Sequence, residues 1–301
     1  MSVSGRLRSS LARTSPVAGV LATLVLLLTA ACGTNGTAPA TTRPSASTES
    51  TTSSSTSTTT TATSATTTTT QAVPTTEVPP SSPCPIPPAG AQAEAPSIPD
   101  GGKTVALTFD DGPGPSTSAI LSILESFKVR ATFFDIGTQE TEWPSDVRAE
   151  AADGFLIGNH TWNHPDMETL SASAQAAELD EVTDEQKSLT GTVPCVFRPP
   201  YGDYNSTTLS LAAQRHMAVW LWNVDTEDWE AEGSSSSYSV NRIISLAESE
   251  GSALQHPVVL MHNQAIPMPA TVAALPTVIQ YFKDHGYTFV DLLGRTGPPG
   301  S

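Results

Sequence analysis

Between about residues 101 and 295, short apolar runs alternate with longer stretches in which apolar residues recur every three or four positions. The short runs have the length and composition of buried strands, and the longer stretches have the spacing of amphipathic helices. We expect strands at residues 104–109, 130–136, 154–159, 195–198, 217–224, 257–261 and 287–290. We expect helices at residues 116–127, 145–152, 171–189, 207–214, 240–247 and 270–285.

This alternation predicts the fold class. Strand followed by helix through a whole segment is typical of a mainly parallel sheet, and near-continuous apolar strands indicate cover on both faces. Seven strands in about 195 residues are fewer than in the eight-stranded (β/α) barrel, which has about 250 residues. The sequence therefore predicts an α/β fold with a small, distorted (β/α) barrel of about seven strands. An open doubly wound sheet is the alternative.

Residues 1–32 have a different pattern. They begin with basic residues, continue with an apolar run from Val17 to Ala31 and end in small residues before Cys32. This is the pattern of a secretory signal, and the run is shorter than the ~20 residues of a membrane span. The residues before Cys32 resemble a bacterial lipobox. We therefore expect export and a lipid anchor at Cys32 that holds the protein on the cell surface, with signal cleavage and full secretion as the alternative.

A linker is expected at residues 33–83. It contains no aromatic residue, and 24 of the 30 residues from Thr41 to Thr70 are Ser or Thr. Such a segment buries too little apolar surface to offset its conformational entropy, so we expect it to be disordered and to act as a tether. The expected organisation is a signal at 1–32, the linker at 33–83, a lead-in segment at 84–100, the folded domain at 101–295 and a tail at 296–301.

The chain has three cysteines. If Cys32 is lipidated, Cys84 and Cys195 remain as one pair in an oxidising compartment, and we expect a disulfide between them. Neither has a second cysteine or a histidine at ligand spacing, so metal binding by these thiols is the weaker interpretation.

The net charge of −16 argues against a nucleic-acid partner, because no cluster of Lys and Arg is present to neutralise phosphates. An acidic balance predicts solubility and does not exclude an uncharged glycan as substrate. A tethered domain also gives no reason to expect more than a monomer.

Polar residues follow most of the expected strands, which favours the barrel because such enzymes build their sites at the carboxyl ends of the strands. Asp110 and Asp111 follow the first strand. Adjacent carboxylates can divide the work, one binding a metal and the other taking a proton from water. Adjacent residues on a strand face opposite sides, so we expect the turn at Gly112 and Pro113 to bring both to one site.

His160 and His164 follow the third strand, four residues apart. If the segment turns helically, both imidazoles lie on one face and reach one cation. The pair alone is a weak signal. Two histidines with a carboxylate from another strand end, however, form a facial set that leaves open positions for water and substrate.

Three further strand ends have residues suited to acid–base chemistry. Arg198 is a candidate for orienting a catalytic carboxylate, and the backbone N–H of Tyr201 in the stiff loop that follows is a candidate for binding an oxyanion. Asp225 and Asp228 follow another strand. His262 ends the sixth and is able to hold a proton for a leaving group if it faces a carboxylate.

Five segments in order, TFDDGP, HTWNHP, RPPYG, DTEDW and LMH, extend from Thr108 to His262. They resemble the five motifs of the polysaccharide deacetylases of the NodB-homology type, carbohydrate esterase family 4. The resemblance covers essentially the whole expected domain. It implies a distorted (β/α) barrel that removes acetyl groups from N-acetylated sugars with a divalent metal, usually zinc, with cobalt or another metal as alternatives.

The resemblance also implies a role for each matching residue. Asp110 is the expected general base, oriented by Arg198, and His262 is the expected general acid. The partner of His262 is Asp228, with Asp225 as second choice. The expected metal ligands are Asp111, His160 and His164, and the expected substrate contacts are Trp229 and Leu260 at the acetyl methyl group and the Tyr201 N–H at the oxyanion.

The expected function is metal-dependent deacetylation of a cell-surface glycan with release of acetate. Export and the tether rank the N-acetylglucosamine of peptidoglycan first, chitin-type oligomers second and acetylated xylan, which would make the protein an esterase, third. A non-catalytic protein that binds wall glycan is the alternative from another class.

Overall fold

The computed structural model describes residues 84–231 and 233–300. The expected signal, the expected lipidation at Cys32 and the expected Ser/Thr-rich linker lie outside these residues. Within the described part of the chain, no helix is both long enough and apolar enough to cross a membrane.

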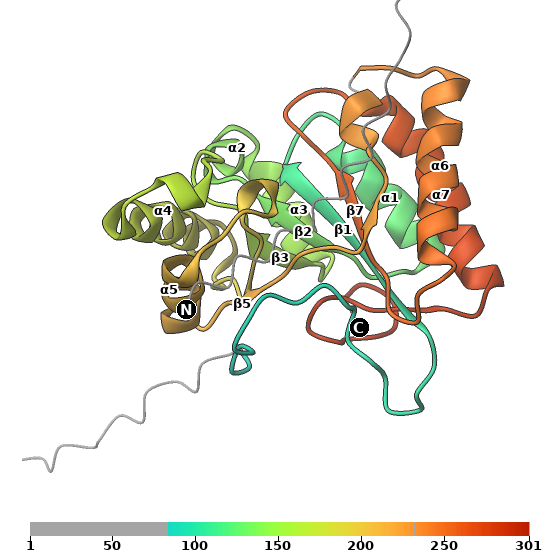
Figure 1. Ribbon diagram of the computed structural model, residues 1–301. Helices are drawn as coiled ribbons and strands as arrows, with labels where there is room; N and C mark the ends of the chain where they lie inside the picture. The colour runs from blue at the N-terminus through green and yellow to red at the C-terminus, as the bar shows by residue number, and fades with distance from the viewer. Residues whose placement is uncertain (1–83, 232, 301) are drawn as a thin grey trace, which may run out of the picture. The chain divides into compact units, whose positions relative to one another are not determined.

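All strand pairs in the sheet are parallel, and seven strands follow one another in the order β5-β4-β3-β2-β1-β7-β6. A short eighth strand, β8, pairs with the start of β1. The long strands β1 and β7 lie at the centre of Figure 1. The strands are β1 Thr104–Gly112, β2 Thr132–Asp135, β3 Leu156–Asn159, β4 Val196–Phe197, β5 Ala218–Val219, β6 Val224–Asp225, β7 Val258–His262 and β8 Thr288–Phe289.

The segment 217–224 was expected to form one strand and forms two. β5 lies at one edge of the sheet and β6 at the other, and residues 220–223 join them. A link of this length spans at most about 18 Å, so the two edges must curl toward each other. The expected distorted barrel is therefore confirmed. Residues 220–223 are as hydrophobic as a strand, so the sequence pattern did not show that the strand is interrupted there.

The six expected helices are confirmed, with ends within four residues of their predicted positions. A further short helix, α2, has too few apolar residues to produce a helical period. α6 and α7 lie side by side next to α1, and α4 and α5 lie on the other side of the sheet's central strands (Figure 1). The helices are α1 Thr117–Phe127, α2 Gly137–Glu142, α3 Pro144–Ala152, α4 Ala172–Thr190, α5 Ser206–Gln214, α6 Ser237–Gly251 and α7 Pro269–Asp284, with 3-10 turns η1 Met167–Thr169, η2 Pro200–Gly202 and η3 Asp228–Ala231.

β1 separates two apolar clusters because its side chains alternate between the faces of the sheet. Val105, Leu107 and Phe109 pack against the helices, in the cluster that contains the buried residues of α1, α6 and α7. Ala106 belongs to a second cluster with Phe134 inside the curled sheet. Residues of β1 that continue the inner row, Thr108 and Asp110, therefore lie inside the barrel.

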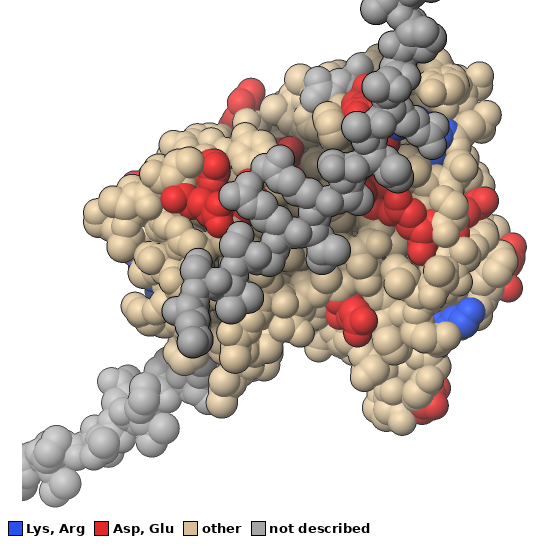
Figure 2. Space-filling model, viewed as in Figure 1, with Lys and Arg blue, Asp and Glu red and all other residues tan. Residues whose placement is uncertain are grey.

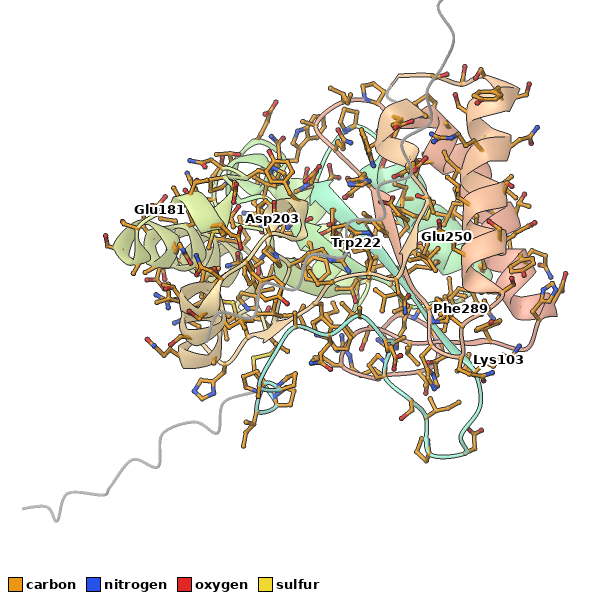
Figure 3. All side chains as sticks on the ribbon, in the orientation of Figure 1. Lys103, Glu181, Asp203, Trp222, Glu250 and Phe289 are labelled. Atoms are coloured by element: carbon orange, nitrogen blue, oxygen red, sulfur yellow. A yellow bond between two sulfur atoms is a disulfide. The ribbon has the colours of Figure 1, made fainter. Side chains whose placement is uncertain are left out.

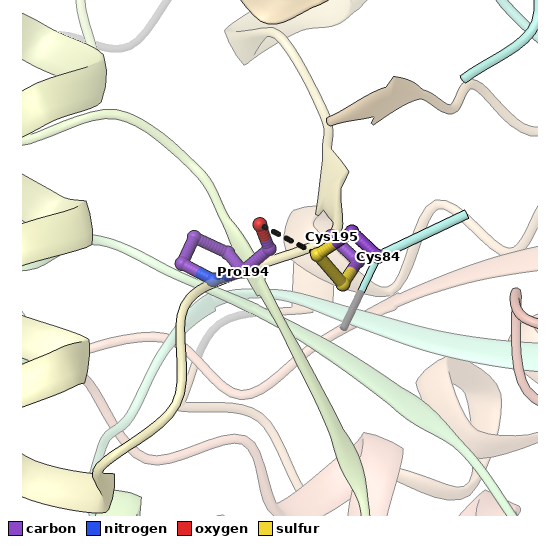
Figure 4. Close-up of a disulfide and its surroundings, with 3 residues drawn as sticks. All are labelled: Cys84, Pro194 and Cys195. Carbon is purple, nitrogen blue, oxygen red and sulfur yellow. Dashed lines mark hydrogen bonds between the residues drawn. A yellow bond between two sulfur atoms is a disulfide. The ribbon is translucent and has the colours of Figure 1, made fainter. Parts of the chain in front are cut away.

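The expected disulfide between Cys84 and Cys195 is present (Figure 4). It attaches the lead-in segment to the residue before β4. The segment then runs along the edge strand β5. The N–H of Gln92 donates to the Val219 carbonyl oxygen, and the N–H of Leu221 donates to the Gln92 carbonyl oxygen. Ala95 is buried in the inner cluster. The lead-in segment is thus packed on the barrel and protects the short edge strand β5.

Three fully buried carboxyl groups lie between the sheet and the helices α2, α3 and α4. They belong to Asp135, Glu140 and Glu150. Gln186 Nε2 donates to Glu140 Oε1 at 2.6 Å, and the carboxyl groups of Asp135 and Glu150 contact each other. Burial raises the pKa of Glu140 to about 9, with a further contribution from the charge of Asp135. Burial and the same neighbour raise the pKa of Glu150 well above its usual value.

We predict that Glu140→Gln stabilises the protein increasingly as the pH rises. In the wild type, the contribution of this group to stability is fully present below pH 4.5, the ordinary value, and is lost as the pH rises toward about 9, because the unfolded chain releases its proton in this range while the folded state retains it. A glutamine at this position keeps an oxygen that accepts from Gln186 Nε2 and has no carboxyl proton to titrate. The midpoint of thermal unfolding should match the wild type at pH 4 and exceed it by at least about 3 °C at pH 8.

The control is Glu142→Gln, which removes an exposed carboxylate at the end of the same helix. Its midpoint should follow the wild type at both pH values. Equal shifts for both variants would show that the buried carboxyl group has no special effect.

Candidate active site

Asp110 and Asp111 both lie within β1, and a bulge allows them to serve one site. Asp110 pairs with Phe134 of β2, and the next paired residue is Gly112, so Asp111 is an extra residue in the strand. Its φ is 67°, in the left-handed region, which Asp tolerates better than most residues. The expected turn begins at Gly112, the last residue of the strand, and comes after both carboxylates. The bulge at Asp111, and not this turn, places the two carboxylates at one site.

Arg198 holds the carboxylate of Asp110 inside the barrel. Its side chain is fully buried, and Nη1 donates to Asp110 Oδ1 and to Thr108 Oγ1, each at 2.7 Å. Nε and Nη2 donate to the carbonyl oxygens of Trp220 and Leu221 at 3.3 and 3.1 Å. A charge-assisted bond of this kind fixes one oxygen of Asp110 and leaves Oδ2 available.

The three expected metal ligands converge. Asp111 Oδ1 lies 3.3 Å from His160 Nε2 and 3.1 Å from His164 Nε2, and the three ligand atoms lie within 4.8 Å of one another. His160 Nδ1 contacts the Arg198 carbonyl at 2.7 Å, which directs Nε2 toward the site.

These residues fit a divalent cation. Asp111 Oδ1 is buried and has no hydrogen-bond partner among the described residues, although two imidazoles face it. Burial alone would raise the pKa of Asp111, but His160 and His164 lower it far below its usual range. The carboxylate is therefore ionised and ready to bind a cation. One carboxylate oxygen and two imidazoles are ligands that suit zinc.

The segment from His160 to His164 forms an irregular loop, whereas the spacing suggested a helical turn. Thr161 and His164 have φ values of 70° and 62°. The N–H of Thr161 donates to Asn159 Oδ1 at 2.9 Å, and the N–H of His164 donates to Thr161 Oγ1 at 3.1 Å. Both imidazoles reach one point through this left-handed backbone, and helical periodicity is not the reason.

His262 pairs with Asp228, the first choice. Its Nδ1 contacts Asp228 Oδ1 at 2.7 Å, its backbone N–H donates to Oδ2 at 2.9 Å, and Thr271 Oγ1 donates to the same oxygen at 2.7 Å. Burial alone would lower the pKa of His262, but Asp228 raises it to about 9. The imidazole is therefore protonated near neutral pH. Asp225 accepts the N–H of Glu227 at 2.9 Å and lines the pocket instead.

One pocket of about 540 Å³ contains Asp110, Asp111, His160, His164, Asp225 and His262. Arg198 and Asp228 do not line it and contact Asp110 and His262 from outside the pocket. Tyr201, Trp229 and Leu260 line it, as expected, together with two residues that sequence reasoning missed, Trp222 and Gln264. Trp222, labelled in Figure 3, belongs to the link between β5 and β6. Trp222 lies in the apolar run 217–224, so the sequence pattern predicted a strand residue there and not a pocket residue. Thr108 was also missed, although its position two residues before Asp110 indicated a shared face.

Residues 97–220 match the family model described as polysaccharide deacetylase. A peptidoglycan-N-acetylglucosamine deacetylase of Bacillus cereus is 34% identical over 198 residues, which are 64% of this chain and 88% of the relative. The chain belongs to the polysaccharide deacetylase family. The solved structure of the Bc1960 peptidoglycan N-acetylglucosamine deacetylase has a TM-score of 0.60 and 29% identity, and the match covers 66% of this chain and 89% of that one.

Other members of this deacetylase family are larger or differ in activity. The chitin deacetylase of Amylomyces rouxii is 34% identical over 187 residues, which are 60% of this chain and 44% of the relative. The first relatives matched thus extend well beyond the shared domain. A Bacillus anthracis protein described as a CE4 family pseudoenzyme has a TM-score of 0.58 and 26% identity, covering 64% of each chain. The fold alone therefore does not establish catalysis, and the site residues must decide it.

We predict that loss of an expected metal ligand weakens zinc binding, whereas loss of the Asp110 carboxylate leaves it nearly unchanged. His160→Ala should weaken zinc binding by more than the 10–100-fold that is typical for loss of an outer-shell partner, because it removes one of three ligands. Asp110→Asn should leave the dissociation constant within about threefold. Competition with a chromogenic chelator measures both constants, and strong zinc binding by His160→Ala would refute the ligand assignment.

Proposed function

We propose that this protein is a metal-dependent N-deacetylase that removes acetyl groups from N-acetylglucosamine residues of peptidoglycan. The decisive observation is that two separate sets of groups face one pocket. Asp111, His160 and His164 form a ligand set. Asp110, a candidate proton acceptor, and His262, a candidate proton donor, line the same pocket. The family relationship and the fold support the same reaction class.

A divalent metal, with zinc ranked first and cobalt or another ion as alternatives, would be held by the ligand set and would supply Lewis acidity to the acetyl carbonyl and to water. Asp110 acts as general base: Arg198 holds Oδ1 at 2.7 Å, so Oδ2 takes the proton of the attacking water. We further propose that the Tyr201 N–H, on the adjacent loop, donates to the oxyanion of the tetrahedral intermediate.

His262 acts as general acid. Its Nδ1 is held by Asp228, which leaves Nε2 as the nitrogen available to the pocket. An amide nitrogen is a poor leaving group unless it is protonated, so transfer of the Nε2 proton completes the cleavage of the C–N bond. The amine and acetate then leave. Trp229 and Leu260 supply apolar surface for the acetyl methyl group.

An uncharged sugar suits the electrostatics of the domain. Asp and Glu are more prominent than Lys and Arg on the visible face (Figure 2), and the chain has a net charge of −16. The pocket has carboxylates at Asp110, Asp111 and Asp225, while its one supporting arginine, Arg198, is already paired with Asp110. We propose that the protein is exported and that a lipid at Cys32 or free secretion places it near wall glycan. No nucleic-acid partner is proposed, and the protein acts as a monomer.

We predict zinc-dependent release of acetate from peptidoglycan and from N-acetylglucosamine oligomers by residues 84–301, which retain the disulfide and the lead-in segment. A chelator should abolish release and added zinc should restore it. Asp110→Asn should reduce turnover by at least about 100-fold because the general base is lost. Acetate is measured enzymatically, in parallel on peptidoglycan, on the oligomers and on acetylated xylan.

The substrates distinguish the remaining possibilities. Release from the oligomers alone would identify a chitin-type deacetylase, and release from xylan alone would identify an esterase. Zinc binding without release from any substrate would contradict the proposal and favour a glycan-binding protein. Full activity in Asp110→Asn would reject the assignment of the base.

We predict that Asp228→Asn shifts the alkaline limb of the activity profile to lower pH. The reaction requires protonated His262, so activity falls as the pH rises through its pKa, which Asp228 raises to about 9. Asparagine still accepts from Nδ1 but has no charge, so the pKa should fall toward 6.5 and the limb should move by about one unit or more.

The measurement is kcat/KM against pH for both proteins. Both profiles use the same saturating metal, because its positive charge lowers the pKa of His262 in each. Glu230→Gln, an exposed change in the same turn, η3, serves as control. Coincident limbs for wild type and Asp228→Asn would show that His262 is not the titrating acid.

A further inference from the structure

The loop from His160 to His164 requires external support. Two of its residues, Thr161 and His164, have positive φ values of 70° and 62°, a conformation that is unfavourable for residues other than glycine. Such a backbone persists only when its surroundings hold it. Since both imidazoles of the ligand set are on this loop, the contacts that hold the loop also determine the geometry of the metal site.

One side of the loop rests on the start of α2. The N–H groups of Gly137 and Thr138 donate to the carbonyl oxygens of Thr161 and Trp162, at 3.1 and 3.0 Å. A Cβ atom at Gly137 would lie 2.2 Å from the Trp162 ring, so a side chain is excluded there. These contacts satisfy carbonyl oxygens and leave the N–H groups on the other side of the loop to be satisfied.

Glu178 of α4 accepts those N–H groups. Its Oε2 lies 2.8 Å from the backbone nitrogen of Trp162 and 3.1 Å from that of Asn163. Consecutive N–H groups next to a left-handed residue form a concave site for an anion, and bonds to a carboxylate are stronger than bonds to a neutral acceptor. One carboxylate oxygen thus holds two of the three residues between the histidine ligands, Trp162 and Asn163, from outside the pocket.

Anchoring of α4 does not depend on Glu178. Leu179 and Val182 of this helix are buried, Gln186 donates to the Gly158 carbonyl at 3.0 Å, and Asn159 donates to the Leu179 carbonyl at 2.9 Å. Other residues therefore attach the helix to the sheet, and the hydrogen bonds of Glu178 go to the loop.

We propose that Glu178 is a positioning residue for the metal site: it holds the His160–His164 loop in the conformation that directs both imidazoles at Asp111 before metal binds. The inference rests on the metal-dependent function proposed above. It adds a residue that belongs to none of the five motifs, does not line the pocket and bonds to the backbone of the loop.

The test compares Glu178→Ala and Glu178→Gln with a matched control. Glu181→Gln changes an exposed glutamate on the same helix, which Figure 3 shows on the side of α4 away from Trp222. The first measurement is the zinc dissociation constant by chelator competition. The second is the thermal midpoint of the metal-free proteins, and the third is turnover as a function of zinc concentration.

Glu178→Ala should weaken zinc binding by about 10-fold or more, in the range found for outer-shell partners. Glu178→Gln, which keeps an acceptor without the charge, should weaken it by a smaller factor, and Glu181→Gln should match the wild type. At saturating zinc, the turnover of Glu178→Ala should return to within a few-fold of the wild type, because the general base and acid are unchanged.

An unchanged dissociation constant in both Glu178 variants, with or without a lower thermal midpoint, would overturn the inference and leave Glu178 as a structural anchor. If Glu178→Ala is too unstable to assay, the constant measured for Glu178→Gln decides. Weaker zinc binding in the variants supports the inference even if the wild type releases no acetate, in which case the proposed activity alone fails. A wild type that binds no zinc would overturn both.

Discussion

The buried contact between Arg198 and Asp110 connects the sheet, the link that closes the barrel and the candidate metal site. The guanidinium group is removed completely from water, a loss that a single carboxylate does not offset in the absence of further hydrogen bonds. Thr108 and the carbonyl oxygens of Trp220 and Leu221 supply these bonds. The same residue's own carbonyl orients His160. One arginine thus positions the proposed general base and, through its backbone, one of the proposed metal ligands.

Barrel closure makes this contact possible. The carbonyl oxygens that receive the guanidinium belong to the link between β5 and β6, where the chain leaves one edge of the sheet and reaches the other. Within a ladder these oxygens would bond to a neighbouring strand. The break in the strand therefore frees acceptors inside the barrel, and the same break brings Trp222 to the pocket.

The buried carboxyl groups of the domain differ in ionisation and role, and the groups that surround each of them determine which. Asp111 faces two imidazoles and is ionised, which prepares it for a cation. Asp228 is ion-paired with His262 and keeps that imidazole protonated. Among the described residues, Glu140 and Glu150 have no cationic partner, and they keep their protons near neutral pH because burial penalises the charge. Sequence position did not distinguish these groups; their neighbours do.

The sequence by itself determined the parallel α/β architecture, six of the helices, the pairing of Cys84 with Cys195 and the strand ends at which the site forms. Periodicity and motif order are local properties, so they are readable from the chain. Only the tertiary structure decided that Asp228 and not Asp225 faces His262, that a bulge at Asp111 places both carboxylates, and that residues 220–223 leave the sheet. It also decided the contact of Glu178 with the ligand loop. These features depend on which distant residues meet, because hydrogen-bond partners and burial arise only when the strands and helices pack.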